Sequence, residues 1–137
     1  VQLEGLALSR LGGFLALTPV GDTSKLAKLA ASAVRDLDRF RAPLTKAELD
    51  RRIRPNMSAT HLANLKDWGY PHVMEAFKFH ITLTGSLPRK QAEQTQAALS
   101  PILAPLLPRP FSITTLTLCA EDQTGLFHEV LCQPLGQ

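Results

Sequence analysis

The sequence contains few cysteines and no grouping of residues that is typical of a metal site. Cys119 and Cys132 are its two cysteines, and they do not form a C-x-x-C pair. No histidine, cysteine or carboxylate pair has the H-x-x-x-H or related spacing of zinc ligands. We therefore expect two free thiols buried in the core, and we expect no metal ion and no cofactor.

The sequence also lacks the segments that mark several other classes of protein. No run approaches the roughly 18 apolar residues that a membrane helix needs, and the first residues lack the basic-then-apolar order of a signal peptide. A glycine-rich phosphate loop, a G-x-S-x-G motif and the aromatic-basic interleaving of RNA readers are absent. These absences favour a cytoplasmic protein that does not bind membranes.

The composition indicates one globular domain of ordinary size. The chain has 137 residues, of which 45% are apolar and 20% charged, enough for a hydrophobic core without disulfides. Residues 35–54 account for the net charge of +3, with four acidic side chains against seven basic ones. Such a segment can bind phosphate or nucleic acid, but interleaved charges on helices are more often a solvated surface. The basic residues are Arg35, Arg39, Arg41, Lys46, Arg51, Arg52 and Arg54.

The order of the expected elements indicates an α+β fold with a mostly antiparallel sheet. Two apolar strands separated by a pair of glycines predict a hairpin within residues 1–21. Residues 22–76 are expected to form a helical connector, with a capping box at Thr45 and Glu48 and with Gly69 ending its last helix. Residues 77–137 then predict a strand, a helix and a second hairpin.

The strand expected at residues 77–83 carries the most promising chemical groups. Its apolar residues alternate with a polar face formed by Lys78, His80, Thr82 and Thr84. Histidine can transfer a proton near neutral pH, while hydroxyl and ammonium groups can hold the oxygens of a phosphate. This face is therefore a candidate phosphate site, although antiparallel sheets often turn such a face to solvent.

The H-x-T pattern of His80 and Thr82 is a weak indication by itself, because four histidines make a chance match easy. The other histidines are His61, His72 and His128, and none has a hydroxyl two residues further on. We interpret each of these as an ordinary polar or packed residue. One such unit also cannot serve as both the base and the acid that phosphodiester cleavage needs.

Two longer segments give this motif a context. RLGGFLAL at 10–17 and RPNMSATHLANLKDWGYPHVMEAFKFHITLTGSL at 54–87 resemble the two-histidine phosphoesterases encoded beside phosphonate-utilisation genes in bacteria, and WGYP and FHITLTG are their most specific parts. The resemblance implies a bilobed fold in which each lobe supplies one H-x-T or H-x-S strand. It also implies that one histidine acts as base and the other as acid on small cyclic phosphodiesters, while the hydroxyls bind the phosphate.

Carried onto this chain, the resemblance makes His80 and Thr82 the catalytic residues, and it favours Lys78, Thr84 and Tyr70 as substrate-binding residues. The partner it implies is a small phosphorylated substrate, for example a phosphoribosyl cyclic phosphate. The single domain 1–137 would comprise a hairpin of the first lobe at 1–21, the connector at 22–76 and the second lobe at 77–137.

The first motif of that family has no counterpart here, because His80 begins the single H-x-T or H-x-S of the sequence and the chain starts at Val1. We therefore expect a C-terminal part of a longer protein that is inactive alone. Two alternatives remain open. The same face could bind a phosphorylated ligand or an RNA end without catalysing a reaction on it, or two copies of the chain could each supply one His80.

Overall fold

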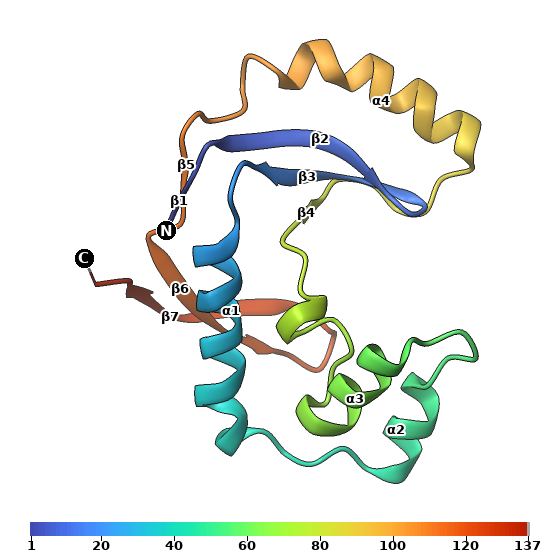
Figure 1. Ribbon diagram of the computed structural model, residues 1–137, viewed down its shortest axis with the longest axis vertical. Helices are drawn as coiled ribbons and strands as arrows, with labels where there is room; N and C mark the ends of the chain where they lie inside the picture. Colours follow the sequence, from blue (N-terminus) through green and yellow to red (C-terminus); the bar gives the residue numbers. More distant parts are fainter. Residues whose placement is uncertain (137) are drawn as a thin grey trace.

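The upper part of the protein is a three-stranded antiparallel sheet covered by one helix. The structure is a computed structural model, and it describes residues 1–136. Strands β2 (Gly5–Leu11) and β3 (Phe14–Val20) form the hairpin predicted from the paired glycines, and Gly12 takes the positive φ of 57° that the turn requires. Helix α4 (Arg89–Leu103) lies along this hairpin (Figure 1).

The third strand of this sheet is shorter than the sequence predicts. A strand over residues 77–83 was expected, but only β4 (Ile81–Thr82) pairs with β3, through Leu17 and Ala16 respectively. The preceding residues follow a 3-10 turn, η2 (Met74–Ala76), and lead toward the sheet without joining it. The prediction of a strand at 77–80 was therefore wrong, and His80 directly precedes the first paired residue.

Below the sheet, the connector forms a series of short helices. These are α1 (Ser24–Leu37), η1 (Asp38–Phe40), α2 (Lys46–Arg52) and α3 (Ala59–Trp68). The capping box of α2 is present, with the Thr45 side chain accepting from the Glu48 N–H and the Glu48 carboxylate accepting from the Thr45 N–H. Gly69 ends α3 with a φ of 75°, as the sequence predicts.

A second hairpin, formed by β6 (Thr115–Glu121) and β7 (Phe127–Pro134), passes behind α1 in Figure 1. A short pair of strands, β1 (Gln2–Leu3) and β5 (Phe111–Ser112), lies at the base of both hairpins. Every residue of β6 and β7 is exposed, including Cys119 and Cys132. The cysteines are free, as predicted, but the expectation that they are buried was wrong, because the described residues leave both faces of this hairpin open.

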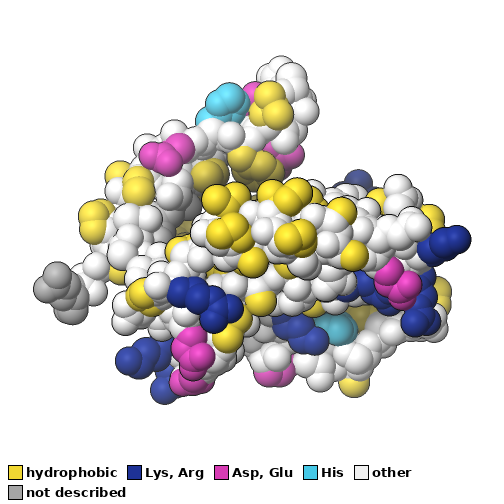
Figure 2. Space-filling view, turned by 90° about the horizontal axis from the view of Figure 1, so that it is seen from above, with side chains coloured by type: hydrophobic (Ala, Val, Ile, Leu, Met, Phe, Trp, Pro, Cys, Tyr) yellow, Lys and Arg dark blue, Asp and Glu magenta, His cyan; other side chains and the backbone are white. Residues whose placement is uncertain are grey.

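These elements confirm the α+β fold with antiparallel sheets. The core is aliphatic, and its largest fully buried side chains, Leu15 of β3 and Leu65 of α3, belong to the sheet and to the connector respectively. In the view from above, hydrophobic side chains gather on the outer surface over α4 (Figure 2). Within residues 1–136, no helix is long and apolar enough to cross a membrane. The buried apolar residues are Leu3, Leu6, Leu15, Ala16, Leu26, Leu65 and Ala92.

Candidate functional site

His80 lies on the wall of a cavity of about 580 Å³ between the sheet and the connector, which we call the histidine pocket. The turn of the first hairpin supplies one side of it, and the first turn of α3 together with the loop after α3 supplies the other. Because the lining combines aromatic and apolar side chains with imidazoles and one ammonium group, the pocket suits a small polar ligand. Its lining residues are Leu11, Gly12, Phe14, His61, Tyr70, His72, Ala76, Phe77, Lys78 and His80.

One hydrogen bond determines which nitrogen of His80 carries a proton. Its Nδ1 lies 2.8 Å from the backbone carbonyl oxygen of Lys78. A carbonyl oxygen only accepts hydrogen bonds, so Nδ1 must be protonated and donate. In the neutral ring the lone pair is therefore on Nε2, the state from which histidine accepts a proton. Phe14 packs against this ring, with 5.6 Å between the ring centroids.

The two threonines of the motif lie in different environments. Thr82 is exposed, and its backbone pairs with Ala16. Thr84 is half-buried, and its Oγ1 accepts a hydrogen bond from the Leu15 N–H at 3.0 Å while donating to the Gly85 carbonyl at 2.9 Å. The hydroxyl of Thr84 thus binds the edge of β3 just beyond the last paired residue of β4. Neither threonine is among the residues that line the histidine pocket.

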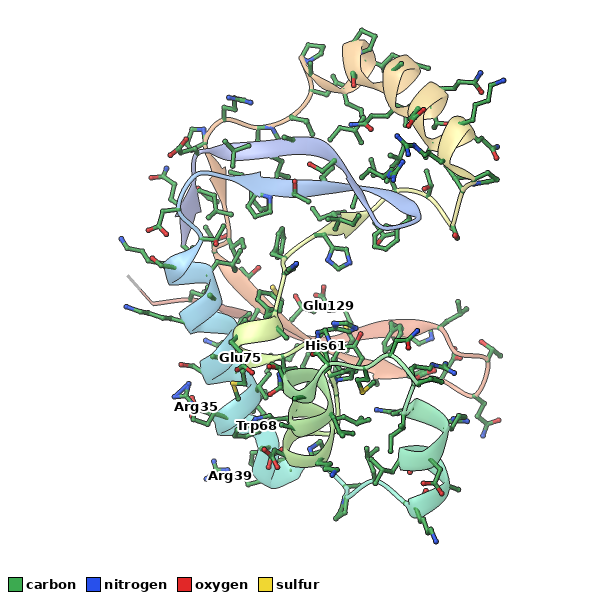
Figure 3. All side chains as sticks on the ribbon, turned by 45° about the vertical axis from the view of Figure 1, so that its right-hand side comes forward. Arg35, Arg39, His61, Trp68, Glu75 and Glu129 are labelled. Carbon is green, nitrogen blue, oxygen red and sulfur yellow. The ribbon has the colours of Figure 1, made fainter. Side chains whose placement is uncertain are left out.

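His61, His72 and Tyr70 form the opposite wall of the pocket. The ring centroids of His61 and His72 are 4.7 Å apart, and those of Tyr70 and His72 are 5.7 Å apart, both in edge-to-face arrangements. Ser58, the N-cap of α3, accepts from the backbone N–H of His61 at 3.2 Å and lies 3.0 Å from its Nδ1. Figure 3 shows His61 at the end of α3 nearest the sheet.

A buried asparagine positions the loop that carries His72. Asn64 of α3 is 5% exposed, and its amide nitrogen donates to the Val73 carbonyl at 3.0 Å. The same nitrogen lies 3.4 Å from the Pro71 carbonyl and 3.4 Å from a carboxylate oxygen of Glu75. These contacts tie the chain on both sides of His72 to α3, so the loop is held by a single buried amide.

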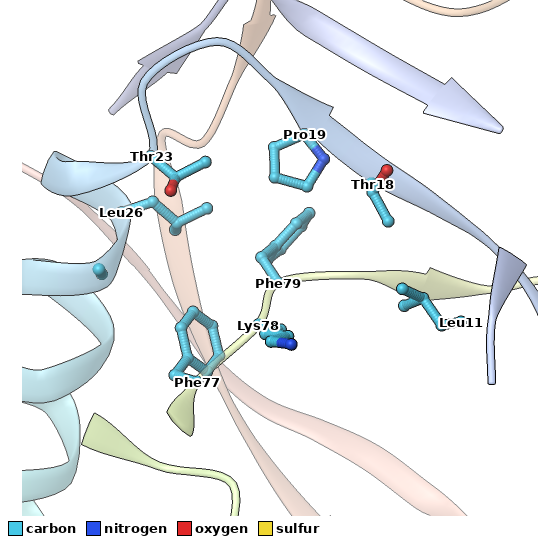
Figure 4. Close-up of a pocket in the computed structure, with 9 residues that line it drawn as sticks. Leu11, Thr18, Pro19, Thr23, Leu26, Phe77, Lys78 and Phe79 are labelled. Atoms are coloured by element: carbon cyan, nitrogen blue, oxygen red, sulfur yellow. The ribbon is translucent and has the colours of Figure 1, made fainter. Parts of the chain in front are cut away.

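On its other side, the segment that leads to His80 borders an apolar cavity of about 230 Å³. Phe77 and Phe79 point into this cavity beside Leu26 of α1 and Pro19 of β3 (Figure 4). Lys78 borders both cavities. The phenylalanines therefore anchor residues 77–79 between α1 and the sheet, and this packing places His80 on the opposite side.

The basic residues of the connector have separate roles. Arg41 donates to the Asp67 carbonyl at 3.1 Å and pairs with Asp38 at 2.7 Å, and Arg52 donates to the Gly69 carbonyl at 2.7 Å. Both arginines thus bind carbonyls at the C-terminal end of α3, where cations are favoured. Arg51 and Arg54 make no ion pair with another described residue, and with Arg52 they border a further cavity next to the histidine pocket.

Of the residues predicted from the sequence, the structure brings His80, Lys78 and Tyr70 together in one pocket. It places Thr82 and Thr84 outside that lining. His61 and His72 were not predicted from the sequence as members of the pocket, and no role was predicted for Asn64. The available signal was the position of His72, which directly follows the W-G-Y-P segment that carries Tyr70.

Comparison with known proteins identifies relatives of this chain. Residues 1–128 match the family described as "Protein of unknown function (DUF1045)". The chain is 34% identical over 129 residues to a protein of Janthinobacterium sp. (strain Marseille) named ribose 1,5-bisphosphate phosphokinase PhnN, covering 91% of this chain and 28% of that protein. A protein of the same name from Laribacter hongkongensis (strain HLHK9) is 39% identical over 82 residues, 60% of this chain and 18% of that protein.

The chain thus spans less than a third of the length of either relative. No solved structure matches it significantly.

Proposed function

This chain belongs to the DUF1045 family, and we propose that it forms part of a phosphoesterase that hydrolyses small cyclic phosphodiesters with His80 as a proton-transfer residue. The observation that carries the proposal is the hydrogen bond from His80 Nδ1 to the Lys78 carbonyl, which leaves Nε2 as the basic nitrogen of the neutral ring. His80 lines a cavity large enough for a sugar phosphate. The resemblance of FHITLTG to the two-histidine phosphoesterases agrees with this role.

The proposed step opens one phosphate ester bond. Nε2 of His80 takes a proton from a water molecule as the water oxygen attacks phosphorus, and the bond from phosphorus to one ring oxygen breaks. That oxygen leaves with a proton from a second acid. The family resemblance assigns the second acid to another H-x-T or H-x-S motif. Within this chain, His61 and His72 are the imidazoles that share the pocket with His80.

The remaining site residues have supporting roles in this proposal. Lys78 supplies positive charge to the lining of the pocket, and Tyr70 presents a ring and a hydroxyl to the ligand. Thr82 lies two residues beyond His80, exposed and outside the lining of the pocket. In this proposal its hydroxyl holds a phosphate oxygen. A role in phosphonate utilisation follows from the same resemblance, and it agrees with relatives that are named for a ribose bisphosphate.

The experiment that tests the proposal is the substitution His80→Gln in the full-length protein, assayed on a cyclic phosphodiester of ribose. General acid–base residues contribute on the order of 10²–10⁴-fold to rate, so we expect a loss of that size with the fold intact. His128→Gln is the matched control, because His128 is exposed on β7 and lies 2.7 Å from Asp122 rather than in the pocket. Unchanged hydrolysis by His80→Gln would reject the proposal, and binding without turnover by the wild-type protein would favour the binding module.

A further inference from the structure

We propose that the substrate carries a second phosphate group, and that this group binds in the cavity beside the histidine pocket, which we call the arginine pocket. This inference rests on the proposed function, since it assigns a further part of the same substrate. The arginine pocket has a volume of about 440 Å³. It is lined by Arg51, Arg52, Arg54, Met57, Tyr70, Pro71 and His72.

The two pockets are neighbours, and two side chains border both of them. Tyr70 and His72 line both of them, with Lys78 and His80 on one side and the three arginines on the other. The proposal places the substrate across Tyr70 and His72, with one part in each cavity. One sugar-sized molecule would place one phosphate beside His80 and the other beside the arginines.

The arginines of this pocket are grouped around one cavity and have no carboxylate partner among the described residues, whereas Arg35, Arg39 and Arg109, which also lack an ion pair, do not share a cavity of this kind. Over residues 1–136, ion pairs to carboxylates occupy Arg10, Arg41 and Arg89, and none involves Arg51, Arg52 or Arg54. Clustered like charges repel one another unless an anion lies between them. Unpaired arginines around one cavity thus indicate a place for an anion.

Hydrogen bonds hold the side chains of Glu48 and Arg52 in place beside the arginine pocket. Glu48 lies in the same helix, and one of its carboxylate oxygens accepts from the Thr45 N–H at 2.9 Å and from the Thr45 hydroxyl at 2.8 Å. These bonds, and to a smaller extent the charges of Arg52 and Arg51, lower the pKa of Glu48. Arg52 is fixed by its bond to the Gly69 carbonyl. Arg51 and Arg54 are exposed, and their guanidinium groups have no side-chain hydrogen bond to another described residue. They are therefore the two groups available to a ligand.

Phosphate is the anion that fits this arrangement. The planar guanidinium group can donate two parallel N–H bonds to phosphate oxygens, and it keeps its charge at any physiological pH. A carboxylate offers two oxygens, whereas a phosphate monoester offers three and carries more negative charge near neutral pH. A phosphate monoester would therefore satisfy Arg51 and Arg54 better than a carboxylate would.

The direct test is equilibrium binding by calorimetry, with ribose 5-phosphate as the probe and ribose as the comparison. The double variant Arg51→Gln/Arg54→Gln removes the proposed ligands and retains the bond of Arg52 to α3. Losing charge-assisted hydrogen bonds should weaken binding of ribose 5-phosphate about tenfold or more. The matched control is Arg35→Gln/Arg39→Gln, which removes the same charge from the last turn of α1 and from η1, away from both pockets (Figure 3).

We expect the control to bind ribose 5-phosphate as the wild-type protein does. Equal affinity of wild type and the Arg51/Arg54 variant, equal losses in both double variants, or no binding by the wild type would overturn the inference. Circular dichroism and urea denaturation of each variant separate loss of binding from loss of fold. Arg51→Lys/Arg54→Lys keeps the charge without the planar group, so it should recover part of the affinity.

Turnover measurements separate this inference from the proposed function. A ribose cyclic phosphate with a 5-phosphate should be hydrolysed with a higher kcat/KM than the same compound without it, and Arg51→Gln/Arg54→Gln should abolish that preference. His80→Gln should bind ribose 5-phosphate normally. If His80→Gln keeps its activity, the proposed function fails whatever the arginines do. If the preference survives in the arginine variant, the second phosphate site fails and the role of His80 stands.

Discussion

Thr84→Val should destabilise the fold while leaving the chemistry of the pocket intact. The Thr84 hydroxyl accepts a hydrogen bond from the Leu15 N–H at 3.0 Å, and Leu15 is fully buried in β3. The Leu15 carbonyl is bound separately, by the Leu83 N–H at 2.9 Å. Valine has nearly the shape of threonine but has no acceptor, so the substitution leaves the Leu15 N–H without a partner.

The size of the effect follows from this contact. A buried backbone donor that loses its partner costs about 1–3 kcal/mol, a large share of the roughly 5–15 kcal/mol by which domains of this kind are stable. The second bond, from the Thr84 hydroxyl to the Gly85 carbonyl, is exposed, and water replaces it at little cost. We therefore expect the free energy of unfolding to fall by about 1–3 kcal/mol.

Urea denaturation followed by circular dichroism measures this change, with Thr82→Val as the matched control. Thr82 is exposed and only its backbone pairs with β3, so the control should change stability by less than about 0.5 kcal/mol. Thr84→Ser should recover most of the loss because it restores the acceptor. Equal stability of Thr84→Val and Thr82→Val would refute the reasoning. A normally stable Thr84→Val that has lost activity would instead place Thr84 on the substrate.

Three further outcomes are expected. Nitrogen NMR of the neutral His80 imidazole should show a proton on Nδ1 and none on Nε2, and the opposite tautomer would contradict the assigned hydrogen bond. Gly69→Ala should cost about 1–2 kcal/mol in urea denaturation because of its φ of 75°, whereas Gly85→Ala, at a position with open space around it, should cost much less. Hydrogen bonds from Thr124 lower the pKa of Asp122. The turn between β6 and β7 should therefore be stabilised above about pH 4 and lose this contribution as acid protonates the carboxylate. In carbon NMR, the titration midpoint of the Asp122 carboxyl group should lie below that of an unperturbed aspartate.

Local signals predicted the parts of the fold that neighbouring residues determine. Thr45 and Glu48 form the expected capping box, and Gly69 ends α3 in the expected left-handed conformation, because each needs only a few adjacent residues. The glycine turn at Gly12 likewise depends on the conformation of one residue. At these positions the spacing of a few residues in the sequence is enough to predict the local backbone geometry.

Tertiary contacts decided the parts that the sequence did not predict. Alternation suggested a strand over residues 77–83, but packing of Phe77 and Phe79 against α1 and β3 competes with pairing, and Met74 turns the chain with a φ of 52° just before it. The burial of Cys119 depends on what covers β6, which alternation within one strand does not reveal.

The candidate site was predictable only in part for the same reason. His80 could be singled out by its motif, and Tyr70 by the W-G-Y-P segment. His72 joins His61 in the pocket because Asn64 holds the loop after α3 in place, through contacts to backbone carbonyls that no side-chain pattern encodes. The arginine pocket likewise exists because Arg51 and Arg54 of the α2 region face that same loop.

The acceptor that orients His80 is a main-chain carbonyl, and this has a consequence for how the family can diverge. Residue 78 contributes its oxygen to the imidazole whatever side chain it carries. Evolution can therefore exchange the lysine at this position for a neutral or acidic residue, and so alter the charge presented to a ligand, without changing which nitrogen of His80 holds the lone pair. Substrate preference and proton chemistry can vary independently at two residues only two positions apart.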